Sequence, residues 1–298
     1  METLAPDFPQ PDGAKSRIST LDAPRNYPWT KNPSLFLGGI IIGIICLIAV
    51  FNKQIAPYDP IAIDFNNLLT PPNAQHWLGT DNYGRDLLSR VIVATPLDLT
   101  VGVLSVLFPL IIGIFVGMVS GYYGGWIDNL LMRVVDVFVA FPFMVLIIVV
   151  IAVLGPGLEN VIIAVTAVSW IIYARIVRSE VLIAKNLEYT MSAKVLGYSD
   201  LRIMFRHILP NVISTTIIFG ALDVALDILL AASLGFLGLG VQPPTPEWGS
   251  IISEGAGFMT TAWWIAAFPG LAIVITGAGF ALLADGLADL LRTGGQQA

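Results

Sequence analysis

Long apolar segments recur along this chain, and each is long enough to cross a membrane as a helix. A hydrocarbon core of about 30 Å requires roughly 20 apolar residues in helical form, because only a fully hydrogen-bonded backbone is stable there. Charged residues make up only 12% of the chain, against about 25% in soluble domains. We therefore predict an all-α membrane protein with six transmembrane helices, at residues 34–52, 99–121, 134–154, 158–175, 212–234 and 262–284.

Lysine and arginine are unevenly divided between the alternate loops of this topology. If the N-terminus is cytoplasmic, all but three of the 15 basic residues face the cytoplasm, the exceptions being Lys53, Arg85 and Arg90. Cytoplasmic loops of membrane proteins carry an excess of Lys and Arg. The sequence thus predicts that both termini are cytoplasmic.

The chain divides into four parts. Residues 1–33 are rich in proline and lack periodicity, which predicts a flexible cytoplasmic tail. Residues 34–98 hold the first transmembrane helix and an external loop, and residues 99–290 form a five-helix core. A cytoplasmic loop at about residues 176–211 interrupts this core, and residues 291–298 form a C-terminal tail.

The cytoplasmic loop carries the charged stretch YTMSAKVLGYSDLRIMFRHILPN, residues 189–211. Good helix formers reach Leu196, Gly197 suits the left-handed turn that ends a helix, and Ser199 is a typical N-cap. Pro210 is expected to close the second helix, so residues 179–209 are predicted to form two helices with a bend between them. The second helix is amphipathic, and either rests on anionic lipid or docks a soluble partner.

This stretch resembles the cytoplasmic loop of permease subunits in binding-protein-dependent ABC importers. The family pattern is a Glu-Ala-Ala-like triplet, then Gly, then Ile-x-Leu-Pro. Met191 stands here in place of the usual Glu, and His207 in place of the usual Ile. Glu188, one turn earlier, is a candidate substitute for the missing acid. The resemblance implies ATPase docking by Glu188, Met191, Ser192, Ala193, Gly197, Arg202, Arg206, His207, Leu209 and Pro210.

Four more segments resemble the dipeptide, oligopeptide and nickel branch of these permeases. They are HWLGTDNYGRDLLSRV (76–91), SGYYGGWIDNLLMRVVDVFVAFP (120–142), LGFLGLGVQPPTPEWG (234–249) and FPGLAIVITGAGFALLADGLAD (268–289). The resemblance implies the type I ABC importer permease fold in a bacterial inner membrane. It also implies three kinds of partner: a second, homologous permease, two ATPase subunits or one fused ATPase, and an external solute-binding protein.

No motif for catalysis or for nucleotide binding occurs in the chain. The phosphate-binding pattern GxxxxGK[ST] is missing, as are HExxH and GxSxG. We therefore expect a chain that is not an enzyme and holds no cofactor or metal, with ATP and Mg²⁺ bound by the partner ATPases. The net charge of −6 also argues against nucleic-acid binding.

Two acidic residues, Asp223 and Asp227, lie in the middle of the fifth predicted span. Their i, i+4 spacing puts them on one helix face, and an acid at this depth costs about 2.5–3.5 kcal/mol on insertion scales. They either line the translocation path and favour cargo with a positive group, or they set helix packing as protonated or hydrogen-bonded acids.

The expected cargo is inferred from the resemblance to the dipeptide, oligopeptide and nickel branch and not from any single residue. We expect di- or oligopeptides, with nickel complexes, glutathione and oligosaccharides as alternatives that the branch also carries. A secondary transporter is the rival class, but such proteins often carry inverted repeats, and none is apparent in this sequence.

Overall fold

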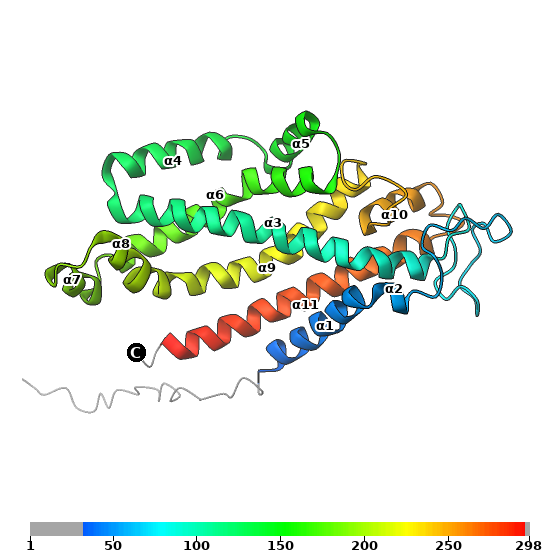
Figure 1. The fold of residues 1–298 in the computed structure, drawn as a ribbon, viewed down its shortest axis with the longest axis horizontal. Coiled ribbons are helices and arrows are strands. Elements are labelled where there is room, and N and C mark those ends of the chain that lie inside the picture. The colour runs from blue at the N-terminus through cyan, green and yellow to red at the C-terminus, as the bar shows by residue number, and fades with distance from the viewer. Residues whose placement is uncertain (1–31, 296–298) are drawn as a thin grey trace, which may run out of the picture.

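The computed structural model describes residues 32–295, so the predicted tail at residues 1–33 and the last three residues fall almost wholly outside the described part. The chain is a bundle of long helices lying side by side (Figure 1). The long helices and their connecting helices are α1 (Pro33–Val50), α2 (Asn52–Ile55), α3 (Leu87–Tyr123), α4 (Gly125–Val139), α5 (Phe143–Leu154), α6 (Leu158–Ala184), α7 (Glu188–Val195), α8 (Asp200–Arg202), a π-helical segment (Ile203–Ile208), α9 (Leu209–Phe236), α10 (Trp248–Ala256) and α11 (Trp264–Gly295).

Five helical segments in the described part are long and apolar enough to cross a membrane. They are α1, α3, α6, α11 and the continuous helix Asp200–Phe236, which includes α9. A sixth crossing arises if α4 and α5 together form one span, although they are bent by 87° relative to each other. The structure is therefore an all-helical membrane protein with five or six spans.

The predicted third span at residues 134–154 is sharply bent at Pro142. The chain breaks after α4, and Pro142 precedes the first residue of α5 with φ −59° and ψ 127°. Proline lacks an N–H donor and disfavours helical geometry at the residue before it, here Phe141. The span is thus divided into α4 and the short α5.

Helix α3 begins 12 residues before the predicted second span. Its N-cap is Asp86, whose carboxylate accepts a hydrogen bond from the Ser89 N–H at 2.8 Å. Arg90 and Asp98 lower the hydropathy of this first part without ending the helix. With 37 residues, α3 is roughly 55 Å long, so it extends well beyond a hydrocarbon core, and the boundary drawn at residues 98 and 99 lies inside it.

Helices α3 and α6 pack closely along a row of glycines. A Cβ atom at Gly117 would lie 2.5 Å from the Ala174 carbonyl oxygen, and one at Gly121 would lie 2.8 Å from the Val181 Cβ. Gly113 faces Tyr173 in the same way. Small residues let helix backbones approach closely in membranes, so this row makes α3 and α6 one tightly joined pair.

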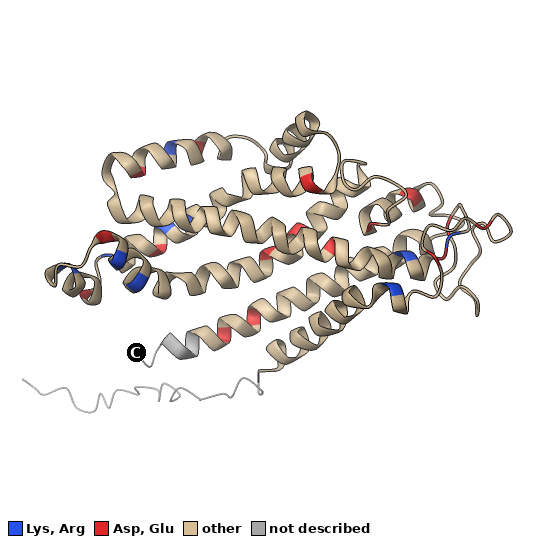
Figure 2. Cartoon of the chain, viewed as in Figure 1, with Lys and Arg blue, Asp and Glu red and all other residues tan. Residues whose placement is uncertain are grey.

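Charged residues gather toward the two ends of the bundle, as Figure 2 shows. At one end the loop before α3 folds against α10 through buried ion pairs. Arg85 Nε lies 2.6 Å from Asp81 Oδ2, and the Glu254 carboxylate is 2.6 Å from Arg85 and 2.7 Å from Arg90. Arg90 also pairs with Asp81. We call this the loop end, and the end that carries α7 and α8 the elbow end.

Candidate functional site

The segment between α6 and α9 forms a bent connection at the elbow end, and we call residues 185–208 the elbow. It contains α7, a turn at Gly197, α8 and the π-helical segment. Gly197 has φ +76°, so the predicted left-handed turn is confirmed. Ser199 occupies the predicted N-cap position of α8, although its side chain makes no capping hydrogen bond.

Two details of the predicted elbow are wrong. The first helix is divided, because α6 ends at Ala184 and α7 begins only at Glu188. Pro210 does not close a helix but lies near the start of α9, directly after the π-helical segment. The helix therefore runs without interruption from Asp200 to Phe236, so the second half of the elbow is continuous with a membrane span.

Tyr198 fixes the shape of the bend. The Arg202 guanidinium carbon lies 5.0 Å from the centre of the Tyr198 ring, a cation–π distance. The His207 ring stacks on Tyr198 with centroids 5.6 Å apart and an interplanar angle of 17°. The turn residue is thus tied to α8 and to the π-helical segment.

Further contacts attach the elbow to the ends of α3 and α6. The Tyr122 hydroxyl donates a hydrogen bond to Asp200 at 2.7 Å, and the Lys194 ammonium lies 5.3 Å from the centre of the Tyr122 ring. Lys185 Nζ donates to the Gly121 carbonyl at 2.7 Å, and Thr190 Oγ1 donates to the Ala184 carbonyl at 2.8 Å. The elbow is therefore joined to the α3–α6 pair.

The predicted docking residues differ in accessibility. Ala193 is buried among Met118, Val177 and their neighbours, so it supports the elbow from inside. His207 and Leu209 are half-buried. The accessible members are Glu188, Met191, Ser192, Gly197, Arg202, Arg206 and Pro210.

Apolar side chains are also exposed on the elbow, and two of them, Val195 and Leu196, were missed by the sequence interpretation. Val195 is 88% exposed and Leu196 70% exposed, next to Met191 on α7. Leu201 and Phe205 extend the apolar surface onto the following helix. Exposed apolar surface of this kind is typical of a protein contact. The sequence signal for it was the pair of large apolar residues, Val195 and Leu196, directly before the Gly197 turn.

Asp223 and Asp227 lie together on α9 and are both buried. The Tyr173 hydroxyl on α6 donates a hydrogen bond of 2.6 Å to Asp223. Both acids line a cavity of about 350 Å³ between α5, α6 and α9, together with Ser169 of α6 and Phe143 of α5. The sequence interpretation found the two acids but not Tyr173 and Ser169. These two polar residues are spaced i, i+4 in an apolar span, and that spacing could have identified them as one polar helix face.

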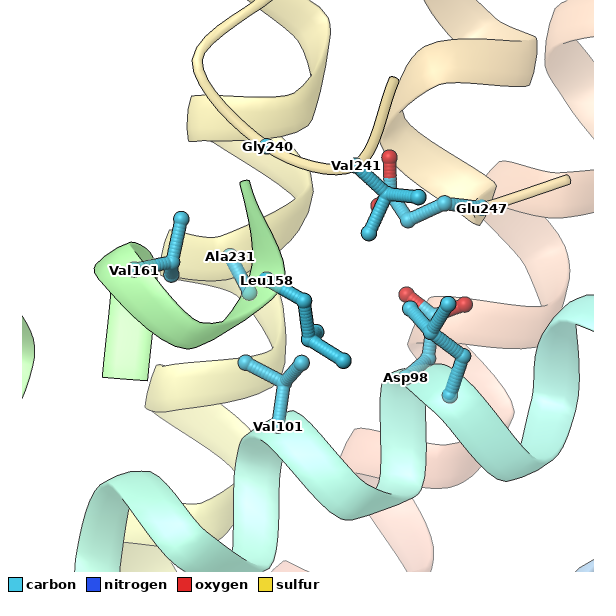
Figure 3. A pocket seen from close by; sticks show the side chains of 9 residues that line it. Asp98, Val101, Leu158, Val161, Ala231, Gly240, Val241 and Glu247 are labelled. Atoms are coloured by element: carbon cyan, nitrogen blue, oxygen red, sulfur yellow. The ribbon is translucent and has the colours of Figure 1, made fainter. Parts of the chain in front are cut away.

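A second acidic pair lies toward the loop end and was not predicted. Asp98 of α3 and Glu247, the N-cap of α10, face each other across a small pocket (Figure 3). Asp98 accepts a hydrogen bond from the Trp248 N–H at 3.3 Å. Burial raises the pKa of Glu247 above its usual range. The pocket volume of about 10 Å³ is too small for cargo, so we assign this pair a structural role.

No group of three His, Cys, Asp or Glu residues in the described part of the chain is arranged to hold a metal ion.

Two protein-family models match the chain. Residues 113–294 match the family described as binding-protein-dependent transport system inner membrane component. Residues 29–72 match the N-terminal transmembrane domain of oligopeptide transport permease C. Together the two matches cover the first span and most of the chain from the middle of α3 onward, and residues 73–112 lie outside both.

Curated relatives are similar over almost the whole length. The glutathione transport system permease protein GsiD of Pectobacterium atrosepticum is 40% identical over 93% of this chain and 96% of the relative. The dipeptide transport system permease protein DppC of Alkalihalophilus pseudofirmus is 39% identical over 97% of this chain and 95% of the relative.

A solved structure shares the fold. An inward-facing form of the MetNI methionine ABC transporter contains a chain that matches with a TM-score of 0.51 at 18% identity. The match covers 67% of this chain and 96% of that chain.

Proposed function

Since this chain belongs to the binding-protein-dependent transport system inner membrane components, the permease subunits of ABC importers, we propose that it translocates di- or oligopeptides. It is a multi-pass inner-membrane permease of the peptide and glutathione branch, and ATP hydrolysis belongs to a separate subunit. Dipeptides and glutathione, the cargoes in the names of its relatives, are both small peptides with a free amine. A peptide is therefore the cargo that the relatives support best.

The exposed apolar surface of the elbow is the observation that carries the proposed mechanism. Met191, Val195 and Leu196 offer an apolar contact to an ATPase, and Arg202 and Arg206 lie exposed on the following helical turns. The contacts of Tyr198 support a fixed shape for this surface. In this mechanism a rigid-body movement of the ATPase is passed through the continuous helix Asp200–Phe236 into the membrane.

The proposed assembly contains this chain, a second homologous permease, two ATPase subunits or one fused ATPase, and an external solute-binding protein. The elbow end faces the cytoplasm in this proposal. Lys185, Lys194, Arg202 and Arg206 at that end agree with the excess of basic residues in cytoplasmic loops. The loop end then faces the binding protein.

Reconstitution tests the proposed function. The chain is purified with its co-purifying partners and incorporated into proteoliposomes with the cognate binding protein. We expect uptake of labelled Ala-Ala or glutathione that requires ATP, because the permease has no other source of energy in this mechanism. Uptake driven by an ion gradient without ATP would support a secondary transporter and contradict the proposal.

The missing acid at Met191 gives a sharper test of docking. If Glu188 substitutes for it, Glu188→Gln should weaken ATPase affinity by up to about fivefold, the range of an exposed ion pair. Met191→Glu added to Glu188→Gln should restore the affinity. Glu159→Gln is the matched control, because Glu159 is exposed at the start of α6, far along the helix from the elbow.

The measurement is the concentration of purified ATPase that gives half-maximal ATP hydrolysis with the reconstituted permease pair. Unchanged affinity in both variants would show that this dock depends on apolar contacts and not on an acid in α7.

A further inference from the structure

The cavity beside α9 has two polar atoms that lack a partner in the described part of the chain. Asp227 and Ser169 are 5% and 3% exposed, and Asp227 Oδ2 and Ser169 Oγ are buried without a hydrogen bond. Burying such atoms unpaired is costly, so buried polar groups in folded proteins nearly always have partners. Both residues line the cavity of about 350 Å³, which is large enough for a small ligand.

The two acids differ in their hydrogen bonding because of Tyr173. The Tyr173 hydroxyl donates a hydrogen bond of 2.6 Å to Asp223, which holds that carboxylate in place. Asp227 lies one turn further along the same face of α9 and has no such donor at Oδ2. The cavity therefore contains one oriented carboxylate, one incompletely paired carboxylate and one free hydroxyl oxygen.

We propose that Asp223, Asp227 and Ser169 bind the ammonium group of the cargo as it crosses the membrane. An ammonium has three N–H donors and a positive charge, which matches three oxygen acceptors and two acids in an apolar surrounding. Among residues 32–295 no Lys, Arg or His lines this cavity, so the described part of the chain supplies no cation there. The inference rests on the proposed function and narrows its cargo to amine-bearing peptides, against neutral oligosaccharides.

An adjoining cavity of about 200 Å³ supports a peptide. It is lined by apolar side chains only and shares Phe143 and Ile172 with the acidic cavity. A peptide whose amine contacts the acids has room there for an aliphatic or aromatic side chain.

The test compares variants of the complete importer in proteoliposomes, with labelled Ala-Ala delivered by the binding protein. Uptake and ATP hydrolysis are measured together. We expect Asp227→Asn to lower uptake per ATP hydrolysed by about tenfold, since one charge-assisted contact is lost. ATP hydrolysis stimulated by the loaded binding protein should stay within about twofold of the wild type. Asp227→Glu should recover part of the uptake.

Two serine variants keep the test informative if Asp227→Asn does not assemble. Ser169→Ala removes only the free hydroxyl and should lower uptake about threefold. Ser179→Ala is the matched control, because Ser179 is on the same helix as Ser169 but does not line the cavity, and its hydroxyl donates to the Ile176 carbonyl at 2.7 Å. Its uptake should equal that of the wild type.

Three results would overturn the inference. Wild-type uptake by Asp227→Asn would mean that the Asp227 carboxyl is protonated in the wild type, because an amide resembles a protonated carboxyl group. A parallel fall of uptake and ATP hydrolysis would mean a structural role, including an ion pair to the partner permease. Equal effects of the two serine variants would also contradict it. If the wild type itself imports neither Ala-Ala nor glutathione with ATP, the proposed function fails instead.

Discussion

At the scale of single residues, Glu247 connects three helices. Its two carboxylate oxygens accept hydrogen bonds from the Gly249 and Ser250 N–H groups, each at 2.7 Å, and so cap α10. The same side chain faces Asp98 of α3 (Figure 3) and lies against Gly235 of α9. One buried acid thus sets the position of α10 against the bundle.

We predict opposite outcomes for substitutions of this acidic pair. Glu247→Ala removes the cap of α10 and should lower the free energy of unfolding by about 1–2 kcal/mol. Asp98→Asn keeps an acceptor for the Trp248 N–H and removes one of two facing acids, so stability should be unchanged or higher. Thermal unfolding of the purified protein measures both. An equal loss of stability in the two variants would contradict this assignment.

Residues that act through a distant partner were the hardest to predict. The i, i+4 spacing of Asp223 and Asp227 was visible in the sequence, and both acids do line one cavity. Tyr173 is 50 positions from Asp223 and Trp248 is 150 positions from Asp98. Such pairs depend on which helices become neighbours, and hydropathy does not determine that.

At the scale of elements, α3 and α6 form the rigid centre of the molecule. Their glycine contacts leave no room for a side chain between the two backbones. The elbow is attached to this pair through Lys185 and Tyr122. The elbow is therefore in contact with α3 and continuous with α9.

Gly117→Ala tests this close packing. The new Cβ atom would lie 2.5 Å from the Ala174 carbonyl oxygen, which belongs to the backbone and cannot rotate away. Helix separation should cost about 1–3 kcal/mol and lower the unfolding temperature. Gly43→Ala in α1 is the control, because nothing lies within 4 Å of its Cβ position. A Gly117→Ala protein as stable as the control would show that the helices adjust freely.

Element positions were predictable where one physical signal dominated. Apolar runs located every long helix, and Gly197 marked the turn because a left-handed conformation suits glycine. The start of α3 was missed because Arg90 and Asp98 lower the hydropathy, although buried partners neutralise Arg90. The break before α5 was underestimated, since proline within a membrane span often causes only a kink.

At the scale of the whole molecule, the two ends are built differently. The loop end is held by the buried ion pairs among Asp81, Arg85, Arg90 and Glu254. The elbow end carries exposed apolar side chains and few buried charges. This difference agrees with the proposed orientation, in which the loop end faces the binding protein and the elbow end offers a docking surface to the ATPase.

Cysteine labelling tests the orientation of the molecule. The single Cys46 is replaced by serine, and Phe65→Cys or Asn186→Cys is added, both at exposed positions at opposite ends. A membrane-impermeant maleimide should label Phe65→Cys from outside the inner membrane. It should label Asn186→Cys only after permeabilisation. The reverse pattern would place the elbow outside.

The π-helical segment at Ile203–Ile208 absorbs one extra residue between the two candidate sites. Its wide turn, in which the Leu209 N–H donates to the Met204 carbonyl, takes in one more residue than an α-helical turn. Each residue of an α-helix turns the face by about 100°. Loss of one residue here would convert the segment to regular helix and leave the elbow and the two acids in nearly the same relative orientation. Loss of one residue from the regular part of α9 before Asp223 would instead turn Asp223 and Asp227 away from their cavity by about 100°. The relation between dock and cavity is therefore an angle as much as a length.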